Sequence, residues 1–201
     1  MTQVPQDWNA SYQQTGPAPW DIGRPQAAFA AIVDAGQLTG DVLDAGCGTG
    51  EHSLLMAAHG ARVVGVDLAE TAIGMARSKA AERGLEATFE AGDILTMRLP
   101  QRGFDGVVDS GLFHVFDDSD RARYVAVLKT VTRTGGACYL MCFSDSQPGD
   151  WGPRRVTSGE IEAAFADGWD VERLEPAAFD INPTFGETQV RAWLAVIRRS
   201  G

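Results

Sequence analysis

The clearest pattern in the sequence is Val42-Leu43-Asp44-Ala45-Gly46-Cys47-Gly48-Thr49-Gly50-Glu51, in which an apolar run of strand length leads straight into a glycine loop. Apolar residues at helical spacing follow the loop. Because glycine has no side chain, a loop of this kind lets the backbone approach a nucleoside closely. A tight turn from strand to helix needs glycine whatever it binds, so the loop alone is weak evidence for a ligand.

Strand-like and helix-like segments alternate along the rest of the chain, which is typical of an α/β protein. Short apolar runs, several rich in valine, predict parallel strands covered on both faces at 41–45, 62–67, 87–91, 103–109 and 136–143. Helices are predicted at 52–59, 69–83, 119–132 and 158–166, and the first three are followed by Gly60, Gly84 and the pair Gly135-Gly136. Runs 169–179 and 188–199 flank a turn-rich segment and predict an antiparallel hairpin. We therefore expect a mixed sheet with helices on both faces and ligands beyond the carboxyl ends of its strands.

Composition and charge narrow the class of protein. Hydrophobic residues make up 44% of the 201 residues, which suits one substantial core, so a single domain over residues 1–201 is expected. The 27 acidic and 17 basic side chains give a net charge of -10, which repels phosphate backbones and anionic lipid. We therefore expect neither nucleic acid nor a membrane as partner.

The termini, the apolar runs and the cysteines give further information on location and on metal or disulfide content. No run approaches the roughly 20 apolar residues that span a bilayer, and the first residues do not resemble a secretory leader, so a cytoplasmic location is expected. Cys47, Cys138 and Cys142 show neither a CxxC pair nor a zinc-ligand spacing. A disulfide framework and a metal site are therefore not expected.

Acidic residues near the loop bear on which nucleoside it holds. A dinucleotide-binding loop carries its third glycine at the position of Glu51, where a pyrophosphate meets the helix N-terminus. A carboxylate there competes with the pyrophosphate. S-adenosylmethionine, which has an ammonium, a sulfonium and only one carboxylate, tolerates Asp44 and Glu51 better. The charge pattern thus favours S-adenosylmethionine over NAD.

Two further acids end predicted strands. Asp67 lies seventeen residues beyond Gly50, where a carboxylate accepts hydrogen bonds from both ribose hydroxyls. The alternative for Asp67 is a cap for the helix that follows. Asp93 ends the third strand and is a candidate acceptor for the adenine amino group, with Ile94 packing on the ring. Its alternative is an aspartate in a turn.

Together these segments resemble the class I S-adenosylmethionine-dependent methyltransferases over nearly the whole chain. LDAGCGTGE is similar to their first motif, VVGVDLAE to the segment with the ribose-binding acid, AGDIL to the adenine motif and FDGVVDSGLFHVF to the fourth motif. The resemblance implies a Rossmann-like, seven-stranded, mostly parallel sheet with an antiparallel last strand. It also implies S-adenosylmethionine as cofactor and S-adenosylhomocysteine as product. The residues expected to bind the cofactor are Trp20, Asp44, Gly46, Gly48, Gly50, Asp67, Leu68, Asp93, Ile94 and Asp109.

The fourth motif indicates where an acceptor binds. Members of the resembled family line the gap between methyl group and acceptor at this point, so Asp109 is expected to be catalytic. Relatives that methylate DNA or RNA amino groups carry Asn or Asp, two prolines and an aromatic residue there, whereas this chain has Asp109-Ser110-Gly111-Leu112. This difference and the acidic charge favour a small-molecule acceptor. His114 titrates near neutral pH and is a candidate base that also contacts substrate; the alternative is a histidine hydrogen-bonded within a turn.

Aromatic residues elsewhere are candidates for the substrate site. Trp8, Tyr12 and Trp20 lie in a polar lead, residues 1–25, ahead of the first strand. This lead is either a lid, whose ring faces attract the sulfonium by about 0.5 to 2 kcal/mol, or a hydrophobic latch onto the sheet. Its segment PWDIGRP resembles the thiopurine, thiol and halide methyltransferase branch and bacterial enzymes that methylate heterocyclic toxins.

The loop after the fifth strand supplies Trp151, which is expected to stack on an aromatic acceptor while Arg154 or Arg155 meets an anionic group. Alternatively, the arginines pair with surface acids. Phe185, in the hairpin turn, is a further pocket candidate.

The sequence therefore predicts an enzyme that methylates O, S or N of a small, aromatic or heterocyclic molecule by in-line displacement. The alternatives are an NAD-linked oxidoreductase or nucleotide-sugar enzyme on a similar fold, a cofactor-binding regulatory module without turnover, and a protein methyltransferase. The oligomeric state is not indicated.

Overall fold

The computed structural model describes residues 7–99, 103–184 and 186–201, and in these residues seven strands form one sheet in the order β3-β2-β1-β4-β5-β7-β6. Strands β1 to β5 run parallel, and β7 is antiparallel to both β5 and β6. The predicted mostly parallel sheet with an antiparallel last strand is confirmed. The strands are β1 (Asp41–Ala45), β2 (Arg62–Asp67), β3 (Thr88–Ala91), β4 (Phe104–Ser110), β5 (Thr132–Phe143), β6 (Trp169–Thr184) and β7 (Glu187–Arg199).

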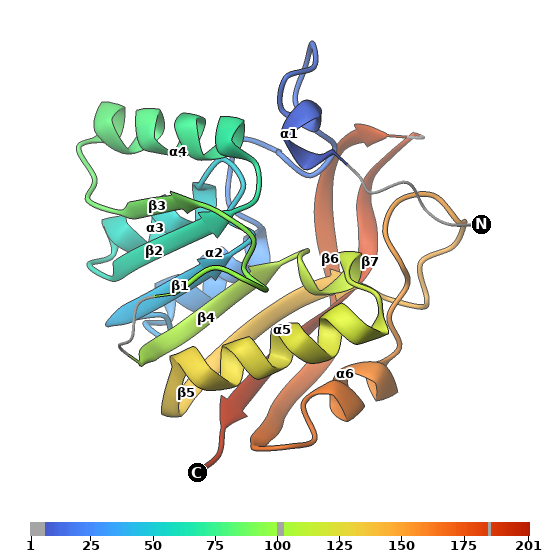
Figure 1. Cartoon of the computed structure of the whole chain (residues 1–201). Coiled ribbons are helices and arrows are strands. Elements are labelled where there is room, and N and C mark those ends of the chain that lie inside the picture. The colour runs from blue at the N-terminus through green and yellow to red at the C-terminus, as the bar shows by residue number, and fades with distance from the viewer. Residues whose placement is uncertain (1–6, 100–102, 185) are drawn as a thin grey trace.

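Helices cover both faces of the sheet (Figure 1). Alternate side chains of the central strands point to opposite faces, so Val42 and Val108 pack with α2 and α3, whereas Leu43 and Val107 pack with α5 and α6. The helical elements are α1 (Trp8–Ser11), α2 (Ala27–Asp34), α3 (Glu51–Ala58), α4 (Glu70–Arg83), the 3-10 turn η1 (Phe113–Val115), α5 (Asp118–Val131) and α6 (Ser158–Ala164).

A smaller core cluster joins α4 to the glycine loop and to β3. Cys47 and Leu54 pack there with Ile73, Ala76 and Phe89. All three cysteines of the chain are free and buried, and they act as core residues. Among the described residues, no helix has both the length and the apolar character needed to cross a membrane.

The start of β5 differs from the prediction. The glycine pair was expected to follow a helix, but α5 ends at Val131 and β5 begins at once. Thr132 pairs with Phe104, after which the register shifts so that Gly106 pairs with Ala137. The glycines therefore lie in an irregular stretch within the strand, where the pairing with β4 is interrupted.

Candidate functional site

The glycine loop runs from the end of β1 into α3 with its glycines in left-handed backbone conformations. Gly46, Gly48 and Gly50 have φ values of 71°, 52° and 86°, which side chains other than glycine rarely tolerate. A Cβ on Gly46 would lie 3.1 Å from Cβ of Leu112, and one on Gly48 would lie 3.0 Å from the Tyr12 hydroxyl. The loop is therefore enclosed by the segment after β4 and by the N-terminal segment.

Gly50 is a glycine for a different reason. A Cβ there would lie 2.9 Å from Cβ of Ala76 and 3.0 Å from Cε1 of Phe89. These atoms belong to α4 and β3, so this position serves the packing of the loop against the protein. Its contact with the cofactor stays a prediction.

Asp67 ends β2 and holds the glycine loop directly. Its Oδ2 accepts a hydrogen bond from the Gly48 N–H at 2.8 Å, and its Oδ1 accepts one from the Ala69 N–H at 2.8 Å. The bond to Ala69 matches the alternative prediction of a cap before α4. Each carboxylate oxygen still has a second lone pair for a ribose hydroxyl. Leu68, beside it, is 56% exposed, so an apolar side chain stands next to the candidate ribose site.

Asp93 and Ile94 lie in a turn after β3. The Asp93 carboxylate accepts hydrogen bonds from the Leu95 N–H at 2.9 Å and the Thr96 hydroxyl at 3.3 Å. This is the turn arrangement weighed as the alternative. Ile94 is buried in the core. Contacts of Asp93 and Ile94 with adenine stay predictions.

Asp44 is a carboxylate buried inside the sheet beneath the loop. It is 1% exposed, and its Oδ2 accepts a hydrogen bond from the Ser53 hydroxyl at 2.6 Å. Burial raises the pKa of Asp44 to about 7, and repulsion from Asp67 and Asp109 adds to the effect. The charges that act on Asp44 are thus themselves carboxylates, so this region favours a cationic ligand.

Asp109 lies at the end of β4 but is turned into the protein. It is 0% exposed, and its carboxylate accepts hydrogen bonds from the N–H groups of Leu112 and Phe113 and from the Tyr124 hydroxyl. Burial raises its pKa to about 6. These donors belong to the protein itself, and the contact of Asp109 with the cofactor and its catalytic role stay predictions. Asp109 ties η1 and α5 to the sheet.

His114 lies in the turn η1, as the alternative prediction had it, but its hydrogen-bond partner is on β5 rather than within the turn. It is 5% exposed, and its Nδ1 accepts a hydrogen bond from the Phe143 N–H at 3.0 Å. Burial lowers the pKa of His114 to about 3, and the charges of Arg121 and Arg155 lower it further. A neutral ring that accepts at Nδ1 carries its proton on Nε2, and the base role of His114 stays a prediction.

The N-terminal segment forms a strap, residues 7–26, over the carboxyl ends of the strands (Figure 1). Its three predicted aromatic residues form one cluster: the Trp20 indole donates to the Tyr12 hydroxyl at 2.8 Å, and the Trp8 ring lies 5.5 Å from Trp20. Because the Tyr12 hydroxyl lies beside Gly48, this cluster covers the glycine loop. Residues 1–6 of the predicted lead lie outside the described residues.

One end of the strap is bound to β6. Gln26 forms two hydrogen bonds with the backbone of Asp180, at 2.8 and 2.9 Å. The Asn182 side chain donates to the carbonyls of Ala18 and Asp21 at 2.8 and 2.7 Å. Sequence reasoning missed these anchors because no pattern joins residues so far apart in the chain.

The start of the strap is bound to α4, and Asp21, whose carbonyl is anchored to β6, also bonds to the glycine loop. The Asn9 side chain accepts from the Thr71 N–H at 2.9 Å, and the Asp21 carboxylate accepts from the Thr49 hydroxyl at 2.8 Å. The strap therefore crosses from β6 to α4.

Trp151 is half-buried after β5, and its ring packs edge-on against Phe143 with centroids 6.2 Å apart. The Arg155 guanidinium lies over both rings and donates to backbone carbonyls of its own loop. Arg154 instead pairs with Asp118 and Glu160, as the surface alternative predicted. Phe185 lies outside the described residues.

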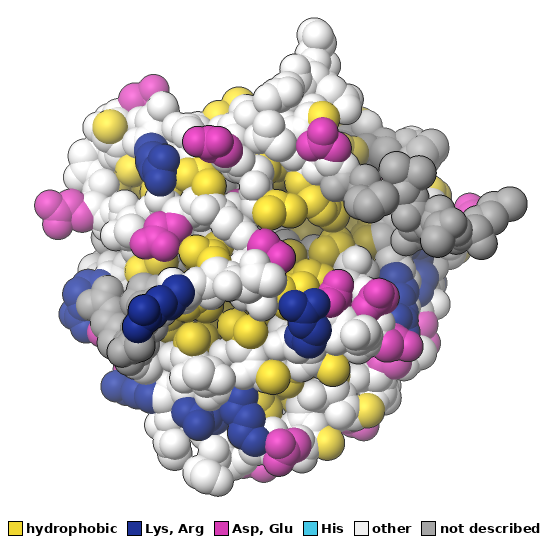
Figure 2. All heavy atoms as spheres, viewed as in Figure 1, with side chains coloured by type: hydrophobic (Ala, Val, Ile, Leu, Met, Phe, Trp, Pro, Cys, Tyr) yellow, Lys and Arg dark blue, Asp and Glu magenta, His cyan; other side chains and the backbone are white. Residues whose placement is uncertain are grey.

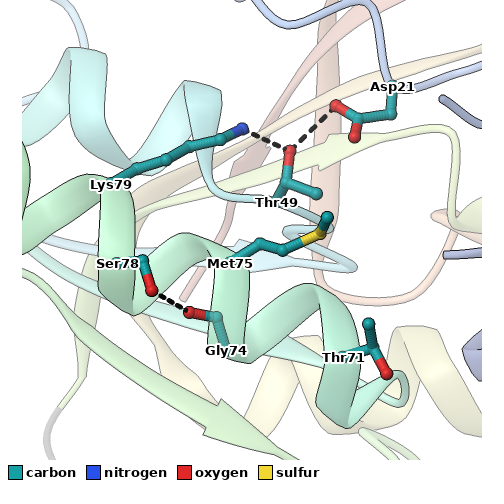
Figure 3. A pocket seen from close by; sticks show the side chains of 7 residues that line it. All are labelled: Asp21, Thr49, Thr71, Gly74, Met75, Ser78 and Lys79. Carbon is teal, nitrogen blue, oxygen red and sulfur yellow. Dashed lines mark hydrogen bonds between the residues drawn. The ribbon is translucent and has the colours of Figure 1, made fainter. Parts of the chain in front are cut away.

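A hollow of about 450 Å³ lies between the strap, the glycine loop and α4 (Figure 3). It borders neither Asp67 nor Asp93, so it adjoins the candidate nucleoside site without being that site. Hydrophobic side chains also gather in the middle of this face of the molecule, below α1 (Figure 2). The hollow is lined by Asp21, Thr49, Thr71, Gly74, Met75, Ser78 and Lys79.

Glu51 corrects one argument made from the sequence. Its carboxylate is bound by Lys79 at 2.8 Å and by Arg83 at 2.9 Å. Burial raises the pKa of Glu51, but the hydrogen bonds and charges of Arg83 and Lys79 outweigh burial and lower it overall. The negative charge of Glu51 is balanced by the two cations on α4, so Glu51 does not repel a pyrophosphate. The choice between S-adenosylmethionine and NAD therefore needs other support.

Comparisons with known proteins supply it. Residues 42–136 match the family model of a methyltransferase domain. The 2-heptyl-1-hydroxyquinolin-4(1H)-one methyltransferase of Mycobacteroides abscessus is 33% identical over 90% of this chain and 85% of that protein. A structure solved in work on the conversion of a disulfide bond into a thioacetal group during echinomycin biosynthesis is 37% identical, with a TM-score of 0.84 over 96% of this chain and 89% of that one.

A third match shows the fold alone. The 1,6-didemethyltoxoflavin-N1-methyltransferase of Burkholderia thailandensis, solved with S-adenosylhomocysteine bound, is 22% identical, with a TM-score of 0.70 over 87% of this chain and 78% of that one. Strand order, glycine loop and the long match to the Mycobacteroides abscessus enzyme agree with one another. The chain therefore belongs to the S-adenosylmethionine-dependent methyltransferases, and S-adenosylmethionine is its cofactor.

Proposed function

We propose that this enzyme methylates O, S or N of a small aromatic or heterocyclic molecule whose nucleophilic atom needs no base from the protein. The observation that carries the proposal is the state of the two ionisable groups predicted at the end of β4. Asp109 is enclosed by its own hydrogen-bond donors, and His114 has a pKa of about 3 with Nδ1 already in use. Neither group is placed to take a proton from an acceptor.

Such an acceptor brings its own nucleophile. S-adenosylmethionine supplies an electrophilic methyl group when bound, and in-line positioning provides most of the remaining rate enhancement. Acidic N- or C-hydroxyl groups are substantially ionised near neutral pH, thiols supply a small but highly nucleophilic thiolate fraction, and pyridine-like nitrogens carry a free lone pair. The similarity to a hydroxyquinolone methyltransferase supports this class of acceptor.

The described residues fit the cofactor. Asp67 keeps lone pairs for the ribose hydroxyls, and the exposed Leu68 offers an apolar surface for adenine. The negative charge of Asp67 acts on Asp44, so the two carboxyl groups together give this region a negative potential, which suits a cationic ligand. We assign the ribose to Asp67 and the adenine to the surface between Leu68 and the turn of Asp93.

We assign the acceptor side to aromatic residues of the strap and of the segment after β5. Trp151 is half-buried against Phe143, and Arg155 lies over both rings. An aromatic surface beside a guanidinium suits a flat acceptor that carries negative charge. Trp8 and Tyr12, in the aromatic cluster of the strap, are assigned to the acceptor as well.

The test is transfer of labelled methyl from S-adenosylmethionine to a series of thiols, phenols, hydroxyquinolones and N-heterocycles of graded acidity. We expect transfer to ionised or lone-pair nucleophiles, with a rate that rises with pH along the acceptor's own titration. Asp67→Ala is the control and should abolish or severely weaken transfer. A pH dependence that stays the same across acceptors of different pKa would contradict the proposal. Tight cofactor binding without transfer to any acceptor would favour the regulatory module.

A further inference from the structure

Thr49 joins three parts of the molecule through one hydroxyl group (Figure 3). It lies inside the glycine loop and is 4% exposed. Its Oγ1 lies 2.8 Å from Nζ of Lys79 on α4 and 2.8 Å from Oδ1 of Asp21 in the strap. A loop threonine is thus in hydrogen-bond contact with both the helix and the strap.

The direction of these hydrogen bonds follows from the chemistry of the groups. An ammonium only donates, so the Thr49 oxygen accepts from Lys79. The single hydroxyl proton of Thr49 is then directed to the carboxylate of Asp21. Lys79 also donates to Glu51 at 2.8 Å, which balances its charge. The bond from Thr49 to Asp21 is therefore a charge-assisted bond between loop and strap.

The same stretch of loop orients Asp67, the acid to which the proposed function assigns the ribose. Gly48, the residue before Thr49, donates its N–H to Oδ2 of Asp67 at 2.8 Å. The Tyr12 hydroxyl of the strap lies over Gly48. A strap that moves away from Thr49 therefore also uncovers the peptide group that fixes the Asp67 carboxylate.

We propose that Thr49 is a positioning residue whose hydrogen bond to Asp21 holds the strap closed over the glycine loop and so controls how tightly, and for how long, the cofactor is held. The inference concerns the cofactor alone and goes beyond the proposed acceptor chemistry. Exchange of S-adenosylhomocysteine for S-adenosylmethionine then requires this bond to break. The anchors of the strap on β6 stay in place, because the Asp21 carbonyl bound by Asn182 is separate from the carboxylate.

The experiment measures cofactor binding without any acceptor, so its outcome does not depend on the proposed substrate class. Dissociation constants by calorimetry and dissociation rates by stopped-flow displacement are measured for S-adenosylmethionine and S-adenosylhomocysteine. The variants are Thr49→Val, Thr49→Ser and Asp21→Ala. Ser78→Ala is the matched control, because Ser78 lines the same hollow but bonds only to its own helix, at the Gly74 carbonyl.

We expect Thr49→Val and Asp21→Ala each to weaken binding about tenfold and to speed dissociation by a similar factor, the size expected for loss of a hydrogen bond to a charged group. Thr49→Ser restores the hydroxyl and should bind like the wild type, as should Ser78→Ala. The double variant Thr49→Val with Asp21→Ala should lose no more than either single variant, because both remove one bond.

Two results would overturn the proposal. The first is that Asp21→Ala binds the cofactor as tightly as Ser78→Ala does. Asp21→Ala is a change on the strap and leaves the core intact. The other is a double variant whose losses multiply to about a hundredfold, which would mean that the two residues act independently. Should Thr49→Val fail to fold, Asp21→Ala and Thr49→Ser still decide the matter. A merely structural role would lower the unfolding temperature of the variants without changing the dissociation rate of the cofactor.

Discussion

Single buried charges set much of the chemistry of this site. Asp44 has a pKa of about 7 in the folded protein because it is buried, whereas an unfolded aspartate titrates near 4. As pH rises from about 4 to about 7, the unfolded chain releases this proton while the folded protein keeps it. The contribution of Asp44 to the free energy of unfolding is therefore complete below about pH 4 and is lost as pH approaches 7.

Cofactor binding should reverse this protonation. A cationic sulfonium and ammonium stabilise the Asp44 carboxylate, so binding of S-adenosylmethionine near pH 7 is expected to release a proton. Calorimetry in two buffers of different ionisation enthalpy measures the proton count. Asp44→Asn keeps the acceptor for Ser53 and should abolish the release. S-adenosylhomocysteine lacks the sulfonium charge and should release fewer protons; equal release by both ligands would refute this explanation.

His114 should matter for stability rather than for proton transfer. Its pKa of about 3 leaves it neutral throughout the working range. We expect His114→Ala to leave the shape of the pH–rate profile unchanged between pH 6 and 9. The variant leaves the Phe143 N–H unpaired, so the free energy of unfolding should fall by about 1–3 kcal/mol. Denaturant unfolding and initial rates across pH measure the two effects. If the pH–rate profile of the wild type has a limb near pH 6.5 that the variant lacks, His114 acts as a base after all.

At the scale of elements, the contact between the glycine loop and α4 depends on the absence of a side chain. Gly50→Ala places a Cβ against Ala76 and Phe89 in a left-handed conformation. It should lower the free energy of unfolding by about 2–5 kcal/mol, the sum expected for overpacking and backbone strain. Gly84→Ala is the matched control: Gly84 also has positive φ, at the end of α4, but no atom lies within 4 Å of its Cβ position. Its cost should be about 1–2 kcal/mol. If Gly50→Ala and Gly84→Ala lose the same free energy of unfolding in thermal or denaturant experiments, packing is not the reason that position 50 requires glycine.

The elements differ in how well the sequence predicts them. The strands ending at Ala45 and Asp67 were predicted at their observed bounds, because each is a short, mainly apolar segment closed by a glycine loop or an acid. Helix α2 was missed because it is short, apolar all round and has no side-chain cap. Helix α1 has only one turn and depends on its contacts with α4.

The candidate site was predictable where it follows strand ends and unpredictable where it depends on burial. Asp67 holds the predicted place, because the end of a parallel strand is fixed by the apolar run before it. Nothing in the sequence tells that Asp109 turns inward to Tyr124, or that His114 is enclosed by the strand beside it. These outcomes depend on contacts between residues distant in sequence.

For the whole molecule, the net charge of -10 should favour one form of the cofactor over the other. S-adenosylmethionine carries one positive charge more than S-adenosylhomocysteine, and an anionic protein speeds the approach of a cation at low salt. Raising the salt concentration should therefore slow association of S-adenosylmethionine and leave that of S-adenosylhomocysteine nearly constant. Stopped-flow association rates over a salt series test this. Parallel slopes for the two ligands would exclude long-range steering.

The position of the strap also has a consequence for folding during synthesis of the polypeptide. The residues of the strap leave the ribosome before the sheet does, yet two of their anchors, Asp180 and Asn182, lie on β6, more than 150 residues later in the chain. A growing polypeptide can build the glycine loop and its neighbouring strands long before it can seat the strap. The cofactor site is therefore completed late in folding. Until β6 has been translated, the glycine loop of the incomplete chain is not covered by the strap.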